Sequence, residues 1–193
     1  ERWVCGAVGR LGPVALLCLL GLGCNPDHCD DLCVATGREL HGRYPGNALF
    51  HSELIEVLLK MGLYDEAIET ALRLEASEPA EEEARVRPQL ARILRAQATL
   101  LSGRPGEAWV LLEPMDARTS ALPIWGGAWL HLVRGQIHDA RGERSAALAE
   151  YRALLALKGA RFNPRAALIA EAALDRPFRA DEYRELPMVG AGP

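Results

Sequence analysis

Three stretches of the chain share one pattern of apolar and polar positions: an amphipathic run, a glycine, and a second amphipathic run. Each glycine is followed five residues later by an alanine, in the pairs Gly62 and Ala67, Gly103 and Ala108, and Gly142 and Ala147. Apolar residues recur at helical spacing on both sides of each glycine. Glycine tolerates the positive φ that ends one helix and begins a tight turn, and alanine lets two helices approach closely. The pattern therefore predicts three helix–turn–helix units in phase.

Further positions in these units resemble the tetratricopeptide repeat family. Gly135 lies seven residues before Gly142, where that family keeps a small residue for close helix packing, and Ala96 holds the matching place in the second unit. Pro79 closes the first unit, as a proline often does in the family. The resemblance covers about residues 48–159.

The units also depart from the family pattern. Their turn glycines are 41 and 39 residues apart, against about 34 in the family, so longer connections are expected near residues 80–88 and 116–127. Ile55 replaces the small residue of the first unit, and Arg95 and Arg134 occupy a usually apolar position in the other two. These two arginines either extend to water or pair with a nearby glutamate, which we favour, or together bind a partner's carboxylate.

The resemblance implies an all-α fold, a tetratricopeptide-like, right-handed helical-repeat solenoid with a C-terminal capping helix. Residues 29–43 predict the helix of a preceding half-repeat, and Asn163-Pro164 is typical of a helix start. Proline-containing breaks beyond residue 175 predict a loosely held tail. The chain accordingly divides into a signal peptide (1–23), a lipidation site with the half-repeat helix (24–47), about three repeats (48–159), the capping helix (160–175) and the tail (176–193).

The first part of the chain differs in kind from the repeats. Arg2 and Arg10 precede an uncharged run over residues 11–23, and such a basic stretch before a short apolar one is typical of a secretory signal. The run has 13 residues, whereas about 20 are needed to cross a bilayer. Its end resembles the lipobox of bacterial lipoproteins, with Cys24 as the lipidation site. Cys18 is the alternative acceptor, and an ordinary signal peptide is the other interpretation.

Two more cysteines, Cys29 and Cys33, lie four residues apart, on one face if the segment is helical. His28 is adjacent, but a closed zinc site takes four ligands in recurrent spacing and the sequence has no second pair. Cys33 falls where the other repeats have their alanine, which favours a buried thiol. A disulfide between the two cysteines stays an alternative, although it would be strained across one helical turn.

Composition and motifs disfavour nucleic-acid binding and catalysis. The 193 residues carry a net charge of −4 and are 49% hydrophobic, and the scattered Lys and Arg form no basic stripe, so we expect no nucleic-acid partner. The sequence has no H-E-x-x-H, no phosphate-binding glycine loop and no G-x-S-x-G. His131 and His138 are seven residues apart, about 10 Å along a helix, too far to share a metal ion. We therefore expect no enzyme activity, no cofactor and no metal.

In the tetratricopeptide family the first helix of each repeat lines an inner groove. Transferring that register predicts seven partner-binding residues: Ser52, Glu56, Ile93, Gln97, Trp129, Leu132 and Gln136. Such a mixture of apolar side chains and amides suits an amphipathic helix or an extended apolar segment. The other interpretation is that several of these residues pack under the chain's own capping helix or tail.

The layout is similar to that of tetratricopeptide lipoproteins that support outer-membrane protein assembly and pilus secretin assembly. This fold-level resemblance implies a non-catalytic, membrane-anchored scaffold or adaptor in envelope complex assembly, facing the periplasm of a bacterial cell and lipid-anchored to the outer membrane. Its expected partners are other envelope proteins or peptide segments, and the membrane through the lipid. The alternatives are an accessory subunit or regulator of an enzyme complex, and an apolar-groove carrier of a peptide or lipid.

Overall fold

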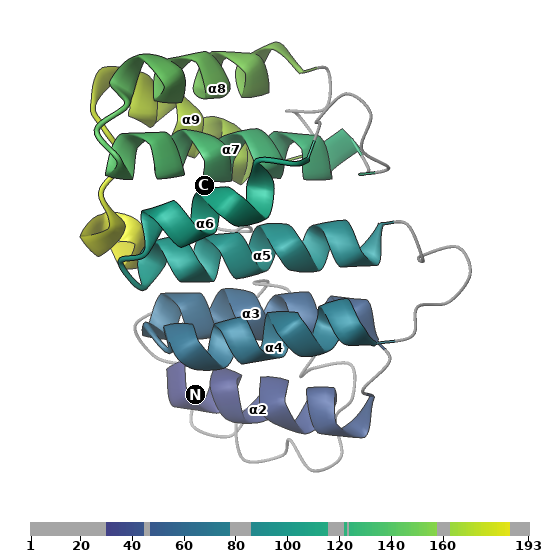
Figure 1. Ribbon diagram of the computed structural model, residues 1–193. Coiled ribbons are helices and arrows are strands. Elements are labelled where there is room, and N and C mark those ends of the chain that lie inside the picture. Colours follow the sequence, from purple (N-terminus) through teal and green to yellow (C-terminus); the bar gives the residue numbers. More distant parts are fainter. Residues whose placement is uncertain are drawn as a thin grey trace.

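The computed structural model of the chain describes residues 30–44, 47–77, 86–115, 122, 124–157 and 163–185. These residues form eight α-helices and a 3-10 helix, with no strand among them, which confirms the predicted all-α class for this part of the chain (Figure 1). The helices are α2 (Asp30–Arg43), α3 (Ala48–Met61), α4 (Tyr64–Ala76), α5 (Arg87–Leu101), α6 (Pro105–Leu112), α7 (Ile124–Ala140), α8 (Arg144–Ala156), α9 (Pro164–Asp175) and η3 (Ala180–Glu185).

The predicted glycine turns join the helices in pairs. Gly62 links α3 to α4, Gly103 links α5 to α6, and Gly142 links α7 to α8, with φ angles of 73°, 84° and 77°. This is the left-handed region that glycine adopts without a steric penalty. The alanine five residues after each glycine is fully buried, which confirms the predicted close approach of the helices there.

Close packing is also confirmed at Gly135 in α7. A Cβ atom added to this glycine would lie 2.4 Å from Cε1 of Tyr151 in α8, so no side chain fits between the two helices. Ala96, the matching residue of α5, is fully buried as well. Small residues therefore lie where the sequence pattern requires them.

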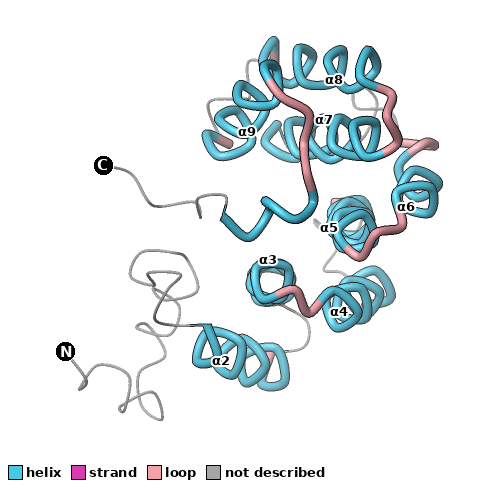
Figure 2. The backbone as a smooth tube through the Cα atoms, turned by 90° about the vertical axis from the view of Figure 1, so that its left-hand side faces the viewer, coloured by secondary structure: helices cyan, strands magenta, loops and turns pink. Residues whose placement is uncertain are grey.

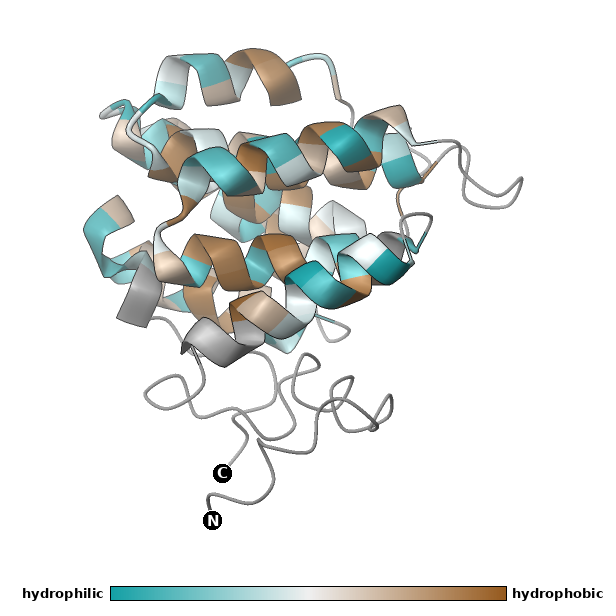
Figure 3. Cartoon of the chain, turned by 90° about the horizontal axis from the view of Figure 1, so that it is seen from below, coloured by the Kyte–Doolittle hydropathy of each residue, from teal (hydrophilic) through white to brown (hydrophobic). Residues whose placement is uncertain are grey.

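Successive helices pack on one another through three apolar clusters. One cluster joins α2, α3, α4 and α5, the next joins α5, α6 and α7, and the last joins α7, α8 and α9. Apolar and polar residues occupy different sides of the helices, as the three- and four-residue spacing of amphipathic helices requires (Figure 3). In Figure 2, α3, α5 and α7 follow one another up the picture as an inner row, with α4 and α6 to their right and α8 above α7. We call the side of the inner row that faces away from α4, α6 and α8 the inner face.

The C-terminal part begins as predicted and then differs. The side-chain oxygen of Asn163 accepts a hydrogen bond of 3.1 Å from the amide of Ala166, which caps α9 at the expected position. The predicted loose tail is wrong for residues 176–185, because this segment, which we call the C-terminal segment, lies across the inner face. Its Tyr183 is 1% exposed and Phe178 is partly buried in two clusters, so two aromatic side chains anchor it despite the proline.

Several predictions concern residues outside the described part of the chain. They include the signal peptide, Cys24 as the lipidation site, Cys18, the His28 and Cys29 neighbourhood, Pro79 and residues 186–193. Cys33 lies in α2, but its side chain is not among those described. No helix within the described ranges is long and apolar enough to cross a membrane.

Candidate interaction site on the inner face

Polar side chains of the inner helices converge on Tyr183 in η3. The ammonium of Lys60 in α3 donates a hydrogen bond of 3.0 Å to the main-chain oxygen of Tyr183. The amide Nε2 of Gln97 in α5 donates to the Tyr183 hydroxyl at 3.2 Å. The indole N–H of Trp129 in α7 donates to Oε1 of Gln97 at 3.0 Å. The Gln97 amide is therefore bonded at both ends, which orients its N–H toward the tyrosine hydroxyl.

Helical spacing places the polar residues of α3 on one face. Glu53, Glu56 and Lys60 follow one another at three and four residues, so they form a stripe along the helix. Between them, α3 is apolar and buried against its neighbours, including Leu54, Ile55, Val57, Leu58 and Leu59. The stripe therefore points away from the apolar cluster and toward the C-terminal segment.

A buried ion pair connects α3 to α9 across this face. Arg165, in the first turn of α9, lies 2.6 Å from Oε2 of Glu56 in α3, and their side chains are only 10% and 11% exposed. The guanidinium also lies over the Tyr183 ring, 5.9 Å from its centre. Burial opposes the positive charge, but Glu56 and Tyr183 offset this effect, and the pKa of Arg165 is raised.

The ion pair leaves some of its polar atoms without partners. Among the described residues, Oε1 of Glu56 and Nε and Nη2 of Arg165 are buried and accept or donate no hydrogen bond. Buried polar atoms of this kind cost stability when nothing pairs with them.

Two further groups of the stripe have shifted pKa values. Burial, and then the nearby charge of Glu56, raises the pKa of Glu53 to about 7. Burial, and then the positive charge of Arg165, lowers the pKa of Lys60 to about 8. Both shifts follow from removing charged groups from water, with like charges close by. Both groups thus titrate near neutral pH.

A second anchor holds the start of the C-terminal segment. The carboxylate of Asp139, at the end of α7, is fully buried and accepts a hydrogen bond of 2.8 Å from the amide of Phe178. It also accepts from the Tyr151 hydroxyl at 2.9 Å and pairs with Arg144 at 3.0 Å. Burial, followed by the charge of Asp139, raises the pKa of Tyr151, so this hydroxyl keeps its proton.

Arg144 connects this anchor to the end of α9. Its Nη2 donates to the main-chain oxygens of Ala173 and Leu174 at 2.6 and 3.0 Å. Carbonyl groups at a helix C-terminus lack partners within the helix, and a cation near them is favourable. Arg144 and Asp139 together fix the point where the chain leaves α9 and turns onto the inner face.

The structure brings three of the seven predicted groove residues together. Glu56, Gln97 and Trp129 lie around the anchors of the C-terminal segment, from three different helices. Ser52 lies on the same stretch of α3 and is half-buried. Gln97 bonds to the chain's own segment, Trp129 bonds to Gln97, and Glu56 pairs with α9, which corresponds to the interpretation that the capping helix and tail cover several of these residues. Whether they also bind a partner stays a prediction.

The other three predicted residues are buried without touching the segment's anchors. Ile93 is fully buried in the cluster that joins α5, α6 and α7, and Leu132, 4% exposed, lies in the cluster of α7, α8 and α9. Gln136 is fully buried, and both of its amide atoms lack a hydrogen-bond partner among the described residues. Neither Ile93 nor Leu132 offers an apolar surface to a partner.

Sequence reasoning missed five residues that define the site: Lys60, Asp139, Arg165, Phe178 and Tyr183. A signal existed for Lys60, which follows the predicted Glu56 by one helical turn. The other four come from α9, the segment and the last turn of α7, which meet only in the folded chain. No local pattern in the sequence indicates such a meeting.

The two repeated arginines have separate structural roles. Arg95 pairs with Glu75 of α4 at 2.6 Å, as the favoured interpretation expected. Arg134 instead donates to the main-chain oxygens of Leu112, at 2.7 Å, and Met115, beyond the end of α6. Arg134 thus supplies a partner for carbonyls that the short helix leaves unpaired. Their repetition reflects two different contacts rather than one shared site.

The two histidines also contact nearby carboxylates. Nδ1 of His131 lies 2.6 Å from Glu150, and Nδ1 of His138 lies 2.6 Å from Glu143. The His138 ring also packs against Trp109, with ring centres 4.5 Å apart. Within the described ranges, no three His, Cys, Asp or Glu side chains are grouped closely enough to hold a metal ion.

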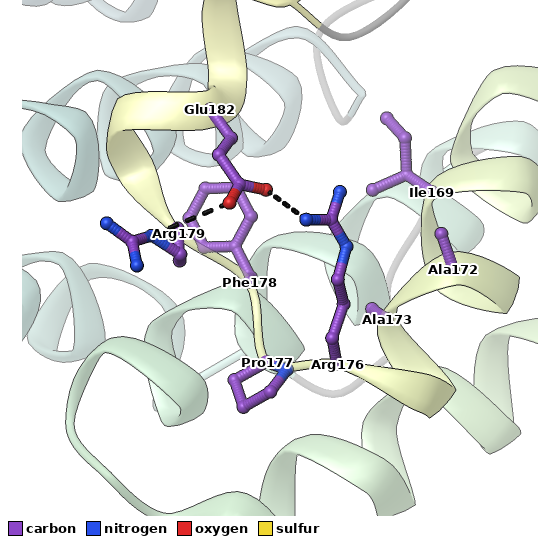
Figure 4. A pocket seen from close by; sticks show the side chains of 8 residues that line it. All are labelled: Ile169, Ala172, Ala173, Arg176, Pro177, Phe178, Arg179 and Glu182. Atoms are coloured by element: carbon purple, nitrogen blue, oxygen red, sulfur yellow. Dashed lines mark ion pairs between the residues drawn. The ribbon is translucent and has the colours of Figure 1, made fainter.

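An open pocket lies between α9 and the C-terminal segment (Figure 4). Its lining residues are Ile169, Ala172, Ala173, Arg176, Pro177, Phe178, Arg179 and Glu182. The two arginines on its rim already pair with Glu182, at 3.0 and 3.5 Å. Both rim cations are thus already paired with a carboxylate of the segment itself.

No protein-family model, no curated protein and no solved structure matches this chain.

Proposed function

We propose that this protein is a non-catalytic interaction adaptor, built as a tetratricopeptide-like, right-handed solenoid, whose inner face binds peptide segments of other envelope proteins. The repeat assignment is supported by the three in-phase helix pairs, their positive-φ glycines and the buried alanines after them. The inner face of such an array is where an extended segment contacts several repeats at once.

The observation that carries the proposal is the way the inner face holds residues 176–185. Each helix of the inner row bonds to this segment through one polar side chain: Lys60 from α3, Gln97 from α5 and Asp139 from α7. Two of the three bonds are to main-chain atoms, which every peptide offers. A lipid lacks a regular series of such groups, so the polar character of the face favours a peptide.

The proposal also places the protein at a membrane through a lipid on Cys24, after removal of residues 1–23. A basic stretch, a short apolar run and a cysteine in this order support it. A Cys24→Ser chain should then stay uncleaved or lose its association with membranes. Mass spectrometry that finds Cys24 retained and unmodified in the native protein would contradict this part of the proposal.

Site-specific photo-crosslinking in cells tests the binding face. A photo-reactive residue replaces Ser52 on the inner face in one chain, and Leu72 or Val110 in the matched controls. The two control side chains lie on α4 and α6 and are 45% and 67% exposed. We expect crosslinks to other envelope proteins from position 52 and none from the controls. Crosslinks from the control positions alone would refute the inner face as the binding site.

A further inference from the structure

We propose that the C-terminal segment can leave the inner face when a segment of a partner protein binds there in its place. The partner segment carries a tyrosine at the position of Tyr183 and an aromatic residue at the position of Phe178. This inference rests on the proposed function and adds the chemistry of the partner and the regulation of the same face.

Among the described side chains of the segment, two aromatic ones are its main anchors in the apolar clusters, with Ala180 packed beside them. Tyr183 is 1% exposed and Phe178 is partly buried, whereas Arg176, Pro177, Arg179 and Asp181 are exposed. The charged side chains described for residues 176–182 pair with one another, as Arg179 with Asp181 at 2.8 Å and Arg176 with Glu182 at 3.0 Å. Removing the segment therefore uncovers two aromatic sites and breaks few other contacts.

The site around Tyr183 selects a tyrosine over other side chains. Since Trp129 donates to the carbonyl oxygen of Gln97, the amide nitrogen of Gln97 points at the hydroxyl. A phenylalanine there would leave this buried N–H without a partner, which is costly. Lys60 and Arg165 lie near the ring face, at 5.2 and 5.9 Å from its centre, and cations favour an aromatic ring.

The contacts with the rest of the segment do not depend on its sequence. Lys60 donates to the main-chain oxygen of Tyr183, and Asp139 accepts from the main-chain amide of Phe178. Any peptide with an aromatic residue and a tyrosine five positions later offers the same two groups. A partner segment of this kind can therefore reproduce the contacts of the chain's own segment.

The attachment of the segment to α9 makes it a competitor. A short tether gives an effective concentration on the order of millimolar, so the covered state dominates unless a partner binds more tightly. The affinity for a free peptide falls in proportion to the fraction of molecules whose inner face is open.

A direct test uses the full chain and a fluorescent synthetic peptide with the sequence of residues 176–185. Three proteins are compared by fluorescence anisotropy: the wild type, a Phe178→Ser/Tyr183→Ser variant, and a matched control, Arg179→Ser/Asp181→Ser, which changes exposed residues of the same segment. We expect the first variant to bind about tenfold or more tightly than the wild type or the control. A peptide with Phe in place of Tyr183 should bind this variant about fivefold more weakly.

Equal affinity of the wild type and the Phe178→Ser/Tyr183→Ser variant would overturn the competition, and equal affinity of the two peptides would overturn the tyrosine preference. If the circular dichroism of the Phe178→Ser/Tyr183→Ser variant shows that its helices are lost, displacement of the segment is measured on the wild type instead. Its Phe178 amide, bonded to Asp139, should exchange with solvent at least about tenfold faster in a large excess of peptide. Unchanged protection of that amide overturns the inference.

These measurements involve no envelope partner, so their outcome is independent of the crosslinking experiment. Crosslinks from position 52 without peptide exchange would refute this inference alone and leave the proposed function standing. Peptide exchange without crosslinks from position 52 would support the exchangeable segment and refute the adaptor proposal.

Discussion

Gly135→Ala should destabilise the protein even though alanine is the better helix former. The added Cβ would lie 2.4, 2.7 and 2.8 Å from three atoms of the Tyr151 ring. Tyr151 is fully buried, and its hydroxyl donates to Asp139, so the ring cannot move without disturbing that bond. Overpacking a buried site costs about 1–3 kcal/mol, and weakening a buried hydrogen bond adds about 1 kcal/mol.

The helix propensity of alanine offsets about 1 kcal/mol of this cost. The free energy of unfolding should therefore fall by about 2 kcal/mol, which for a chain of this size lowers the melting temperature by about 4–8 °C. Thermal unfolding followed by circular dichroism at 222 nm, with denaturant titration for the free energy, measures both quantities. The signal at about 222 nm reports helix content, and the described part of the chain is helical, so its loss follows unfolding.

Gly127→Ala, in the same helix, is the matched control. A Cβ at this position would meet only Cδ1 of Leu157, at 3.8 Å, which is an ordinary contact. The control should raise the free energy of unfolding by about 0.5–1 kcal/mol, as expected for replacing a helical glycine. If Gly135→Ala melted at or above the wild-type temperature while Gly127→Ala behaved as expected, the close contact between α7 and α8 would be refuted.

Three other predictions concern stability. Arg165→Met should cost about 3–5 kcal/mol because it leaves Glu56 charged and buried, and adding Glu56→Met should recover most of it; denaturant titrations that show no recovery would contradict a paired role. Burial raises the pKa of Glu53 from its ordinary 4.5 to about 7, so the folded chain holds the proton more tightly than the unfolded chain. The resulting stabilisation is complete below about pH 4.5 and is lost as the pH rises from there through 7. Melting temperatures between pH 4.5 and 7 should therefore fall more steeply in the wild type than in Glu53→Gln, and parallel curves would refute this. Ala147→Leu should cost about 1–3 kcal/mol by overpacking a fully buried helix crossing, and an unchanged melting midpoint would count against the register.

The helix pairs were predictable because their determinants are local. A glycine with positive φ, an alanine five residues later and apolar residues at helical spacing each act within one or two turns of the chain. The start of α9 at Asn163-Pro164 follows from the same kind of signal, since the cap bond spans three residues. These features need no knowledge of what lies on the other side of the molecule.

The inner face was predictable only in part because it depends on contacts between distant residues. The register transferred from the tetratricopeptide family put Glu56, Gln97 and Trp129 on α3, α5 and α7, but such a register does not reveal which turn of a helix a neighbour covers. Ile93 lies one turn before Gln97 on the same side of α5, yet α6 and α7 bury it. The partner of Glu56 is 109 residues away, in a helix predicted only as a cap.

The energetics of the two kinds of contact support different roles for the helix pairs and the C-terminal segment. The pairs are joined by continuous apolar clusters, whose burial contributes about 1.5–3 kcal/mol for each large side chain. The segment adds only two aromatic side chains, Tyr183 and Phe178, to these clusters, together with a few hydrogen bonds. Each hydrogen bond has a net contribution of about 1 kcal/mol. The ion pair beneath it could be replaced by apolar residues with little loss of stability. Most members of the clusters come from the helices themselves, so the proposed exchange of the segment would leave the contacts between helices in place. This separation is what an adaptor needs if its own chain covers the site that a partner binds.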